Sequence, residues 1–245
     1  MPTLASGRSW PAPQRSWLMA QVWHDLLFAH WPMPADALRP FIPAPLELDT
    51  YENQAWIAIV PFRMSGIRPR FSPPFPWLSA FPELNVRTYV TYNEKPGVWF
   101  FSLEAANPVA VAIARRWYFL PYFYARMQCV NKGEAILYES QRIHCSAPPA
   151  ALVGRYRPIR EVSPAAAGSL VHWFTERYCL YTSDAHRRVY RGEIDHSPWP
   201  LQAAEAEFEK NTMTSPIGLR LPDIPPLLHF SRRQDVRVWS LRRAG

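Results

Sequence analysis

Proline is the residue that most limits how this chain can fold. Twenty-seven prolines are spread along 245 residues, against only nine glycines. A proline cannot donate to a strand ladder and cannot continue a helix, so few long helices fit between these breaks. The pattern favours strands that are joined by stiff loops.

The composition is that of a folded globular protein. Apolar residues make up 48% of the chain and charged residues 19%, and such a balance is not typical of disordered chains. All-β proteins of this length commonly form one domain. We therefore predict a single domain over residues 1–245, in which residues 1–15 form a loose N-terminal arm.

Runs of β-branched and aromatic residues locate the strands. They predict strands at residues 17–31, 55–64 and 229–241, and two hairpins that turn at residues 93–97 and 131–133. Three helices are predicted: residues 34–39, residues 108–117 behind the cap Asn107, and one that begins near Ser169. Residues 68–82 read as a loop, or a lid. Six or more antiparallel strands with few helices indicate a mainly β, closed or nearly closed barrel.

The charge pattern and the cysteines argue against several classes of partner and location. The net charge of +7 comes almost wholly from arginines, which are spread along the chain rather than gathered in a stripe, so nucleic acid is not predicted as a partner. No apolar leader and no bilayer-length run is found, so no membrane partner is expected. Three cysteines without metal or redox spacing fit a reducing compartment, and we expect a cytoplasmic location. A homo-oligomer is left open.

The strand at residues 81–90 carries the most informative polar residues. Because successive strand side chains point to opposite faces, Glu83, Asn85 and Arg87 share one face. This face suits either an exposed Glu/Arg ladder or a polar pocket. The partner strand after the turn is apolar on both faces through Phe101, which favours a shielded pocket.

A second strand repeats the pattern and adds candidates. Tyr122 shares one face of that strand with Arg126, and its hairpin partner carries Arg142 and His144. Should these strands close around a cavity, arginine forks would suit a carboxylate or phosphate. A partly buried Glu83 with a raised pKa could then move protons.

Other kinds of site receive less support from the sequence. Scattered histidines such as His24, His30 and His144 do not make a metal site, and no metal is predicted; His30 is instead a candidate pocket residue. The sequence has no nucleophile elbow, no P-loop and no dinucleotide-binding glycine motif. Serine hydrolases, NTPases and dinucleotide enzymes are therefore excluded, and no cofactor is predicted.

Several motifs, taken in order, carry a resemblance to a known family. They run from about Trp17 to Glu205 and are FAHWPMPADALRPFIPAPLELD, AWIAIVPFRM, FPELNVRTYV, PGVWFFSLEA, ARRWYFLPYFYARM, TERYCLYT and HSPWPLQAAE. With these stretches the chain resembles the YqjF-like family of uncharacterised bacterial proteins, which looks like a branch of the acetoacetate-decarboxylase-like superfamily. That likeness implies an antiparallel β-barrel around a central pocket.

The resemblance also bears on chemistry. In acetoacetate decarboxylase a pocket lysine after a proline forms a Schiff base, and Tyr122 stands at the similar position here. A phenol cannot form an iminium with a ketone. The three lysines, Lys95, Lys132 and Lys210, lie in turns or in a charged run, where none looks desolvated. Schiff-base decarboxylation is therefore not expected, while Glu83 looks like the counterpart of that family's pocket glutamate.

These observations predict a pocket for a small, anionic molecule. The predicted function is a lyase-like enzyme acting on a keto or hydroxy acid without a Schiff-base lysine. The alternative is a non-catalytic ligand-binding or interaction module on the same barrel. The predicted catalytic residues are Glu83 and Tyr122, and the predicted substrate-binding residues are Asn85, Arg87, Arg142 and His30.

Overall fold

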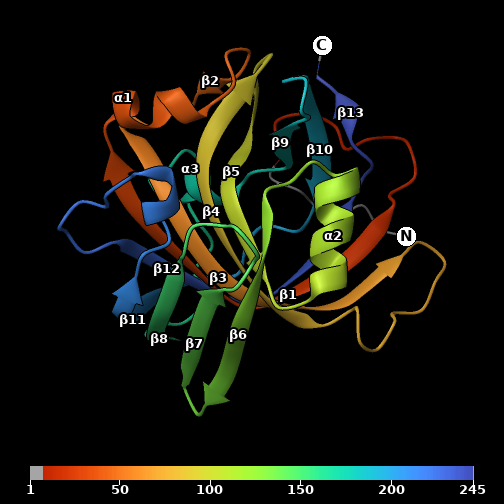
Figure 1. Cartoon of the computed structure of the whole chain (residues 1–245). Coiled ribbons are helices and arrows are strands. Elements are labelled where there is room, and N and C mark those ends of the chain that lie inside the picture. Colours follow the sequence, from red (N-terminus) through yellow and green to blue (C-terminus); the bar gives the residue numbers. More distant parts are fainter. Residues whose placement is uncertain (1–7, 245) are drawn as a thin grey trace.

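Strands make up most of the computed structural model, which describes residues 8–244 (Figure 1). The elements are, in chain order, β1 (Met19–Met33), α1 (Ala35–Leu38), η1 (Arg39–Phe41), β2 (Glu47–Leu48), β3 (Ala55–Pro69), β4 (Phe81–Tyr92), β5 (Lys95–Ala105), α2 (Pro108–Trp117), β6 (Tyr122–Lys132), β7 (Ala135–Arg142), β8 (Ala151–Pro158), α3 (Leu170–Thr175), β9 (Cys179–Ser183), β10 (Val189–Asp195), β11 (Leu201–Asn211), η2 (Ser215–Ile217), β12 (Leu227–Val238) and β13 (Arg242–Arg243).

Hydrogen-bonded strand neighbours follow one another in a continuous ring. The order runs β5, β6, β7, β8, β11, β12, β1, β3, β4, and β4 pairs in turn with β5. Most of these pairs are antiparallel, but β5 runs parallel to both β6 and β9. The prediction of a mainly β fold is confirmed, and the predicted antiparallel pairing holds for all the strand pairs of the described residues except these two.

The parallel pair has a local cause in α2, the helix between β5 and β6. A crossover connection returns the chain to the end where it started, and the next strand then runs parallel to the previous one. As predicted, Asn107 caps this helix: its Oδ1 accepts hydrogen bonds from the amides of Val109 and Ala110, at 3.1 and 3.0 Å. The cap and the proline that follows it therefore begin the crossover.

The β4–β5 hairpin turns more tightly than the sequence suggested. The two turn residues are Asn93 and Glu94, with φ angles of 47° and 58°, so both are left-handed, as a two-residue hairpin turn requires. Gly97 lies inside β5 instead. A Cβ added there would stand 2.7 Å from the Cys179 sulfur, so this glycine permits the close approach of β9 rather than the turn.

Side chains from all nine strands of the ring meet in one apolar core. Leu27, Leu84, Tyr138 and Phe230 are among its buried members, which come mainly from β1, β3, β4, β7, β8 and β12, and partly buried residues of β5, β6 and β11 pack against them. Strands all around a ring can contribute to one cluster only through their inward faces. This side of the sheet is called the inner face below.

The outward face of the same strands is also buried. Phe28 and Phe62 pack there with Trp199, which follows β10, and with Val111 of α2. Figure 1 shows α2 lying across the outside of the sheet. β4 is therefore covered on both faces, and a polar side chain on its outward face is shielded from water.

The predicted N-terminal arm lies partly outside the described residues, since residues 1–7 are not described. The part that is described carries no strand or helix before β1, and Arg8 forms an ion pair with Glu193 of β10 at 2.7 Å. The Arg8 side chain is only 2% exposed. Arg8 therefore anchors the arm to β10, although Ser9, Pro11 and Gln14 of the arm are exposed. Among residues 8–244, no helix combines the length and the apolarity that a membrane span needs.

Candidate functional site

Four polar side chains follow one another along the outward face of β4. These residues, Glu83, Asn85, Arg87 and Tyr89, are called the outer row below. Glu83 and Asn85 are 4% and 5% exposed, and Tyr89 is fully buried. An exposed Glu/Arg ladder is therefore wrong, and the prediction of a shielded face is confirmed.

Glu83 and Tyr122 are brought together at one end of the outer row. The Tyr122 hydroxyl donates a hydrogen bond to Glu83 Oε2 at 2.7 Å. Register explains the meeting: Asn85 pairs with Leu103 of β5, and Leu103 pairs with Tyr122 of β6. Paired residues share a face, so Tyr122 points outward, as Glu83 does.

Burial controls the ionisation of this pair. It raises the pKa of Glu83 from 4.5 to about 8; the hydrogen bond from Tyr122 opposes the rise and the charge of Glu104 adds to it. Burial also raises the pKa of Tyr122 well above its usual value. No ion pair joins Glu83 to another described residue. At neutral pH the pair is therefore mainly a carboxylic acid beside a phenol.

The backbone at Glu83 is held from the other side of the sheet. The hydroxyl of Tyr138, a residue of the inner core, donates to the Glu83 carbonyl oxygen at 2.6 Å. In the sheet itself, Glu83 pairs with Phe62 of the neighbouring strand β3. The carboxyl group is thus carried by a segment that both a strand ladder and a buried phenol keep in place.

His30 lies beside the far end of the outer row. His30 pairs with Ala58, which pairs with Arg87, so a small alanine separates the two larger side chains. The His30 Nε2 lies 2.6 Å from the Tyr89 hydroxyl, and its ring stacks on Phe174 of α3 at 3.7 Å between centroids. Burial, with the charge of Arg87, holds the pKa of His30 well below its usual value, so this imidazole is neutral at pH 7.

Two polar atoms of the outer row lack a hydrogen-bond partner. Asn85 Oδ1 and Arg87 Nε are both buried, and neither makes a hydrogen bond to another described residue. Unpaired buried polar atoms are rare and costly in folded proteins. These two atoms are therefore the ones in this site that are most available to form a hydrogen bond with a ligand.

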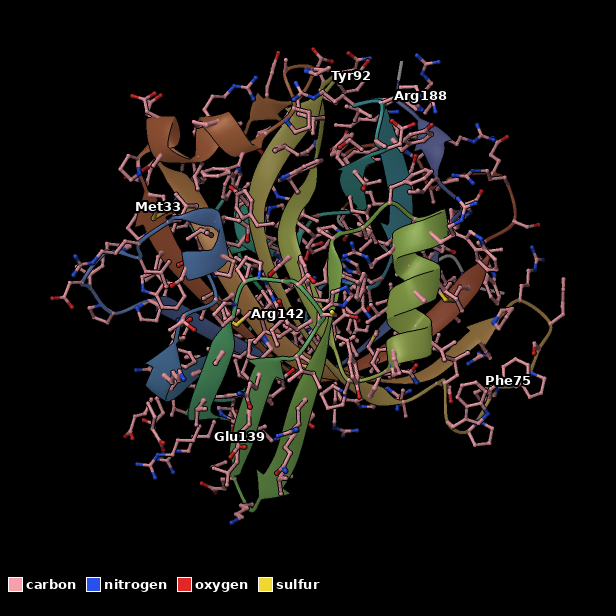
Figure 2. All side chains as sticks on the ribbon, in the orientation of Figure 1. Met33, Phe75, Tyr92, Glu139, Arg142 and Arg188 are labelled. Atoms are coloured by element: carbon pink, nitrogen blue, oxygen red, sulfur yellow. The ribbon has the colours of Figure 1, made fainter. Side chains whose placement is uncertain are left out.

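Arg142 lies on the opposite face of the sheet from Glu83, near the middle of the view in Figure 2. Its Nε donates to Glu104 Oε1 at 3.0 Å, and its Nη2 contacts the same oxygen. Glu104 pairs with Leu84, the neighbour of Glu83, and so points inward. The structure does not bring Arg142 to the outer row.

The Glu104–Arg142 pair is called the inner pair below. The guanidinium of Arg142 lies 3.9 Å from the centroid of the Phe123 ring. Burial raises the pKa of Glu104 from 4.5 to about 7, although the charge and the hydrogen bonds of Arg142 oppose this rise. Both oxygens of Glu104 have partners, because Ser102 donates to Oε2 at 3.3 Å.

Two of the three lysines lie far along their strands from the Glu83–Tyr122 pair. Lys95 is ten residues along β5 from Ala105, the partner of Glu83, or about 33 Å in a strand. Lys132 stands ten residues from Tyr122 at the exposed end of β6, and Lys210 is exposed on β11. The absence of Schiff-base chemistry stays a prediction.

Sequence reasoning missed Arg177, which follows α3. Its side chain is buried, pairs with Asp49 Oδ2 at 2.5 Å, and lies over the rings of Tyr89 and Trp173. The residue belongs to an irregular segment, where no strand alternation assigns a face. No pattern in the sequence signals that it reaches the outer row.

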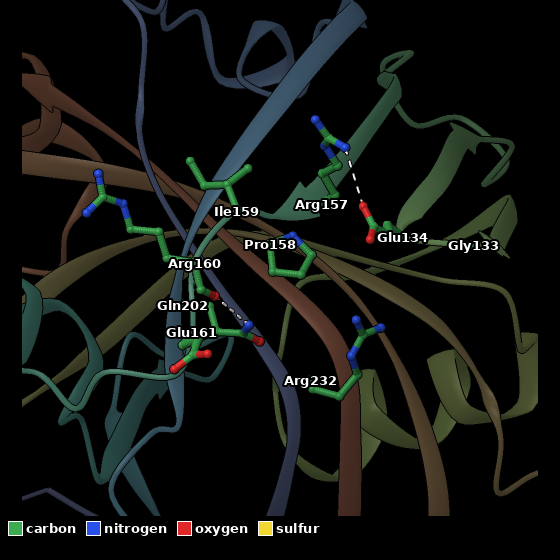
Figure 3. A pocket seen from close by; sticks show the side chains of 9 residues that line it. All are labelled: Gly133, Glu134, Arg157, Pro158, Ile159, Arg160, Glu161, Gln202 and Arg232. Atoms are coloured by element: carbon green, nitrogen blue, oxygen red, sulfur yellow. Dashed lines mark hydrogen bonds and ion pairs between the residues drawn. The ribbon is translucent and has the colours of Figure 1, made fainter.

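The clearest hollows on the described part of the chain lie away from these residues. One of about 660 Å³ opens near the end of β8, where Arg157 pairs with Glu134 and Gln202 donates to the Arg160 carbonyl (Figure 3). A second, of about 500 Å³, lies along β8 and β11. Neither contains a residue of the outer row, so neither is the predicted central pocket.

Comparison with known proteins shows the family of this chain. Residues 20–235 match the family DUF2071, which is described as an uncharacterized conserved protein. The chain belongs to this family. It is also 48% identical to the uncharacterized protein YqjF of Bacillus subtilis (strain 168), over 231 residues that cover 94% of each chain. The predicted resemblance is thereby confirmed.

Solved structures of the acetoacetate decarboxylase type share the fold. The acetoacetate decarboxylase of Legionella pneumophila matches with a TM-score of 0.64 and 12% identity, over 97% of this chain and 93% of that one. The enduracididine biosynthesis enzyme MppR in complex with pyruvate gives 0.65 and 11%, over 100% and 98%. An acetoacetate decarboxylase-like enzyme from Sphingomonas wittichii RW1 gives 0.63 and 11%, over 98% and 100%. At these identities the likeness shows the fold alone.

Proposed function

We propose that this protein binds a small organic acid at the outer row and that Glu83 exchanges a proton with it. The observation that carries the proposal is the buried Glu83–Tyr122 pair, in which a carboxyl group with a pKa of about 8 has one neutral donor at 2.7 Å. A group whose pKa lies near the working pH can both give and take a proton.

The chemistry is proton transfer at a carbon beside a carbonyl group, the step that lyase-like reactions of keto acids share. The ionised Glu83 takes a proton from that carbon and becomes a carboxylic acid, and the substrate becomes an enolate. The reverse transfer restores both. Asn85 supplies an amide hydrogen-bond donor for the oxygen that gains charge, while the Tyr122 phenol donates to the ionised Glu83.

Two further observations support an acid as the ligand. Arg87 has an unpartnered buried Nε and no ion pair with a described residue, so its charge is available. The structure of MppR that shares this fold holds pyruvate, a keto acid. Arg142, the other predicted clamp, is engaged by Glu104, and we therefore assign the carboxylate to Arg87.

We also propose that the ring of nine strands is a closed barrel of the acetoacetate decarboxylase type. The pairing of β4 with β5, which completes the series of neighbours, supports this proposal. Because apolar side chains fill the inner face, the ligand site belongs in the buried layer outside β4 rather than at the centre of the ring.

Deuterium exchange tests the proposed function directly. Pyruvate and 4-oxopentanoate are incubated with the protein in D2O, and loss of the proton signals beside the ketone is followed by NMR. We expect catalysed exchange that rises about tenfold per pH unit below pH 8 and then levels off, because the ionised Glu83 is the base.

Two variants separate catalysis from background. Glu83→Gln should abolish the catalysed exchange, while Glu139→Gln, which alters an exposed carboxylate on β7, should keep it. Binding without exchange in the wild-type protein would favour the non-catalytic module instead. Exchange that survives Glu83→Gln unchanged would overturn the proposed role of Glu83.

A further inference from the structure

Two guanidinium groups lie beside one ring at the end of the outer row away from Tyr122. The guanidinium carbons of Arg87 and Arg177 are 5.9 and 4.9 Å from the centroid of the Tyr89 ring. They are close enough to repel each other: burial lowers the pKa of Arg177, and the charge of Arg87 lowers it further. Two cations have been placed together in a buried layer.

Among the described residues, these two cations form one ion pair with a carboxylate, between Arg177 and Asp49. Arg87, Arg177 and Asp49 are the charged side chains that act most strongly on the Tyr89 hydroxyl. Glu83 is protonated and His30 is neutral at pH 7, for the reasons given above. Arg87 therefore brings an unpaired positive charge beside Tyr89, where it is only partly exposed to water, and a charge that is partly buried without a counter-ion is costly.

Both guanidinium groups also keep a free donor. Arg87 Nε and Arg177 Nη2 are buried and have no hydrogen-bond partner among the described residues. The other two nitrogens of Arg177 have partners: Nε donates to the Trp173 carbonyl at 2.7 Å and Nη1 to Asp49. The unused donors and the excess charge call for the same kind of group, an anion with planar oxygens.

We propose that Arg87 and Arg177 together bind the carboxylate of a singly charged organic acid beside Tyr89. This inference rests on the proposed function, since the subsite would hold the charged end of the acid whose carbon meets Glu83. Glu83 and Arg87 are four residues apart on β4, or about 13 Å between their Cα atoms. This spacing favours an acid whose carboxylate and ketone are separated by methylene groups over one as short as pyruvate.

Isothermal titration calorimetry with 4-oxopentanoate tests the subsite, with pentan-2-one as the uncharged probe of similar shape. The wild-type protein should bind the acid more tightly than the ketone, and more tightly than pyruvate. Arg87→Gln and Arg177→Gln should each weaken binding of the acid by about tenfold to a hundredfold, the range for a charge-assisted hydrogen bond. Binding of the uncharged ketone should change little.

Asp49→Asn is a control whose expected result would not follow if the two arginines had a purely structural role. Removing this carboxylate leaves Arg177 in place and increases the excess positive charge, so 4-oxopentanoate should bind several-fold more tightly. Equal affinity of wild type and Arg87→Gln for the acid, or equal binding of acid and ketone, would overturn the subsite. Arg87 is partly exposed, so this test stands even if Arg177→Gln does not fold.

Glu83→Gln distinguishes the subsite from the proposed function. This variant should bind 4-oxopentanoate as the wild type does, because the acid is held at Arg87 and Arg177. Binding that depends on the two arginines, with no exchange in the wild type, would overturn the proton-transfer role and keep the subsite. Exchange that persists in Arg87→Gln with unchanged affinity would overturn the subsite and keep that role.

Discussion

Two buried carboxyl groups stand almost back to back in this protein. Glu83 points outward from β4, and Glu104 points inward from the position on β5 that pairs with Leu84. Burial raises the pKa of both, to about 8 and about 7. Their partners differ: Glu104 meets a guanidinium and a hydroxyl, and Glu83 meets a single phenol.

The difference separates a structural group from a reactive one. Glu104 forms a charged pair that ties β5 to β7 across β6, and both of its oxygens already accept hydrogen bonds. Glu83 is held by its backbone, while its side chain keeps an exchangeable proton in a buried layer. The comparison predicts that loss of a partner and a change of pH affect the two residues in the same direction but to different extents.

The largest expected effect is on stability when the inner pair is broken. Arg142→Met leaves Glu104 buried without a cation, which should lower the free energy of unfolding by about 3–5 kcal/mol at pH 8. The loss should be smaller at pH 5, where Glu104 becomes protonated. Urea unfolding at the two pH values measures both quantities.

The double variant Arg142→Met/Glu104→Gln is the control for this result. It removes the unpaired charge, and should regain most of the stability that Arg142→Met loses. If the single variant is as stable as the wild type at pH 8, the inner pair is not what ties β5 to β7.

The second effect is on the pH dependence of stability. The pKa of Glu83 is higher in the folded than in the unfolded protein, so the folded state holds an extra proton between pH 4.5 and about 8. Stability from this group is present below pH 4.5 and is lost as the pH rises toward 8. The glutamine in Glu83→Gln cannot ionise. Between pH 5 and 8 the free energy of unfolding of this variant should therefore fall by about 3 kcal/mol less than that of the wild type.

Glu139→Gln, on an exposed carboxylate, serves as the matched control and should follow the wild-type curve. Parallel curves for wild type and Glu83→Gln would mean that Glu83 is ionised at neutral pH. The contrast with Glu104 would then fail.

A smaller effect is expected when the phenol is removed. Tyr122→Phe deletes the hydrogen bond that lowers the pKa of Glu83, so this pKa should rise further, with a loss of about 1 kcal/mol in stability. Carbon NMR of labelled glutamate carboxyls would follow the titration. A pKa that falls instead would show that Tyr122 shields Glu83 from other donors rather than stabilising its ionised form.

The features that the sequence could predict are those decided by residues close together in the chain or on paired strands. Asn107 and Ser169 cap their helices as predicted, because a cap is decided by neighbours within three residues. The burial of the outer row was predicted because the strand that pairs with β4 is apolar on both faces. The meeting of Glu83 and Tyr122 was predicted because each of them lies on a polar face of its strand.

Contacts between distant segments explain what the sequence could not predict. Arg142 was grouped with Glu83 because both were polar positions on neighbouring hairpins. The parallel pairing of β5 with β6 puts Phe123, rather than Tyr122, on the side of Arg142. Arg177 reaches Tyr89 from an irregular segment, where no periodicity reports which way a side chain points.

The smallest expected effect on stability comes from removing the hydrogen bond to the second carboxylate oxygen of Glu104. Ser102 donates to Glu104 Oε2 at 3.3 Å, and this bond lowers the pKa of Glu104. Ser102→Ala should raise that pKa and cost about 0.5–1 kcal/mol, mostly above pH 7, where the carboxylate would otherwise be ionised. Unfolding at pH 6 and 8 measures the difference. A loss as large as that of Arg142→Met would mean that Ser102 contributes as much as Arg142 does, and that the inner pair is a three-residue network.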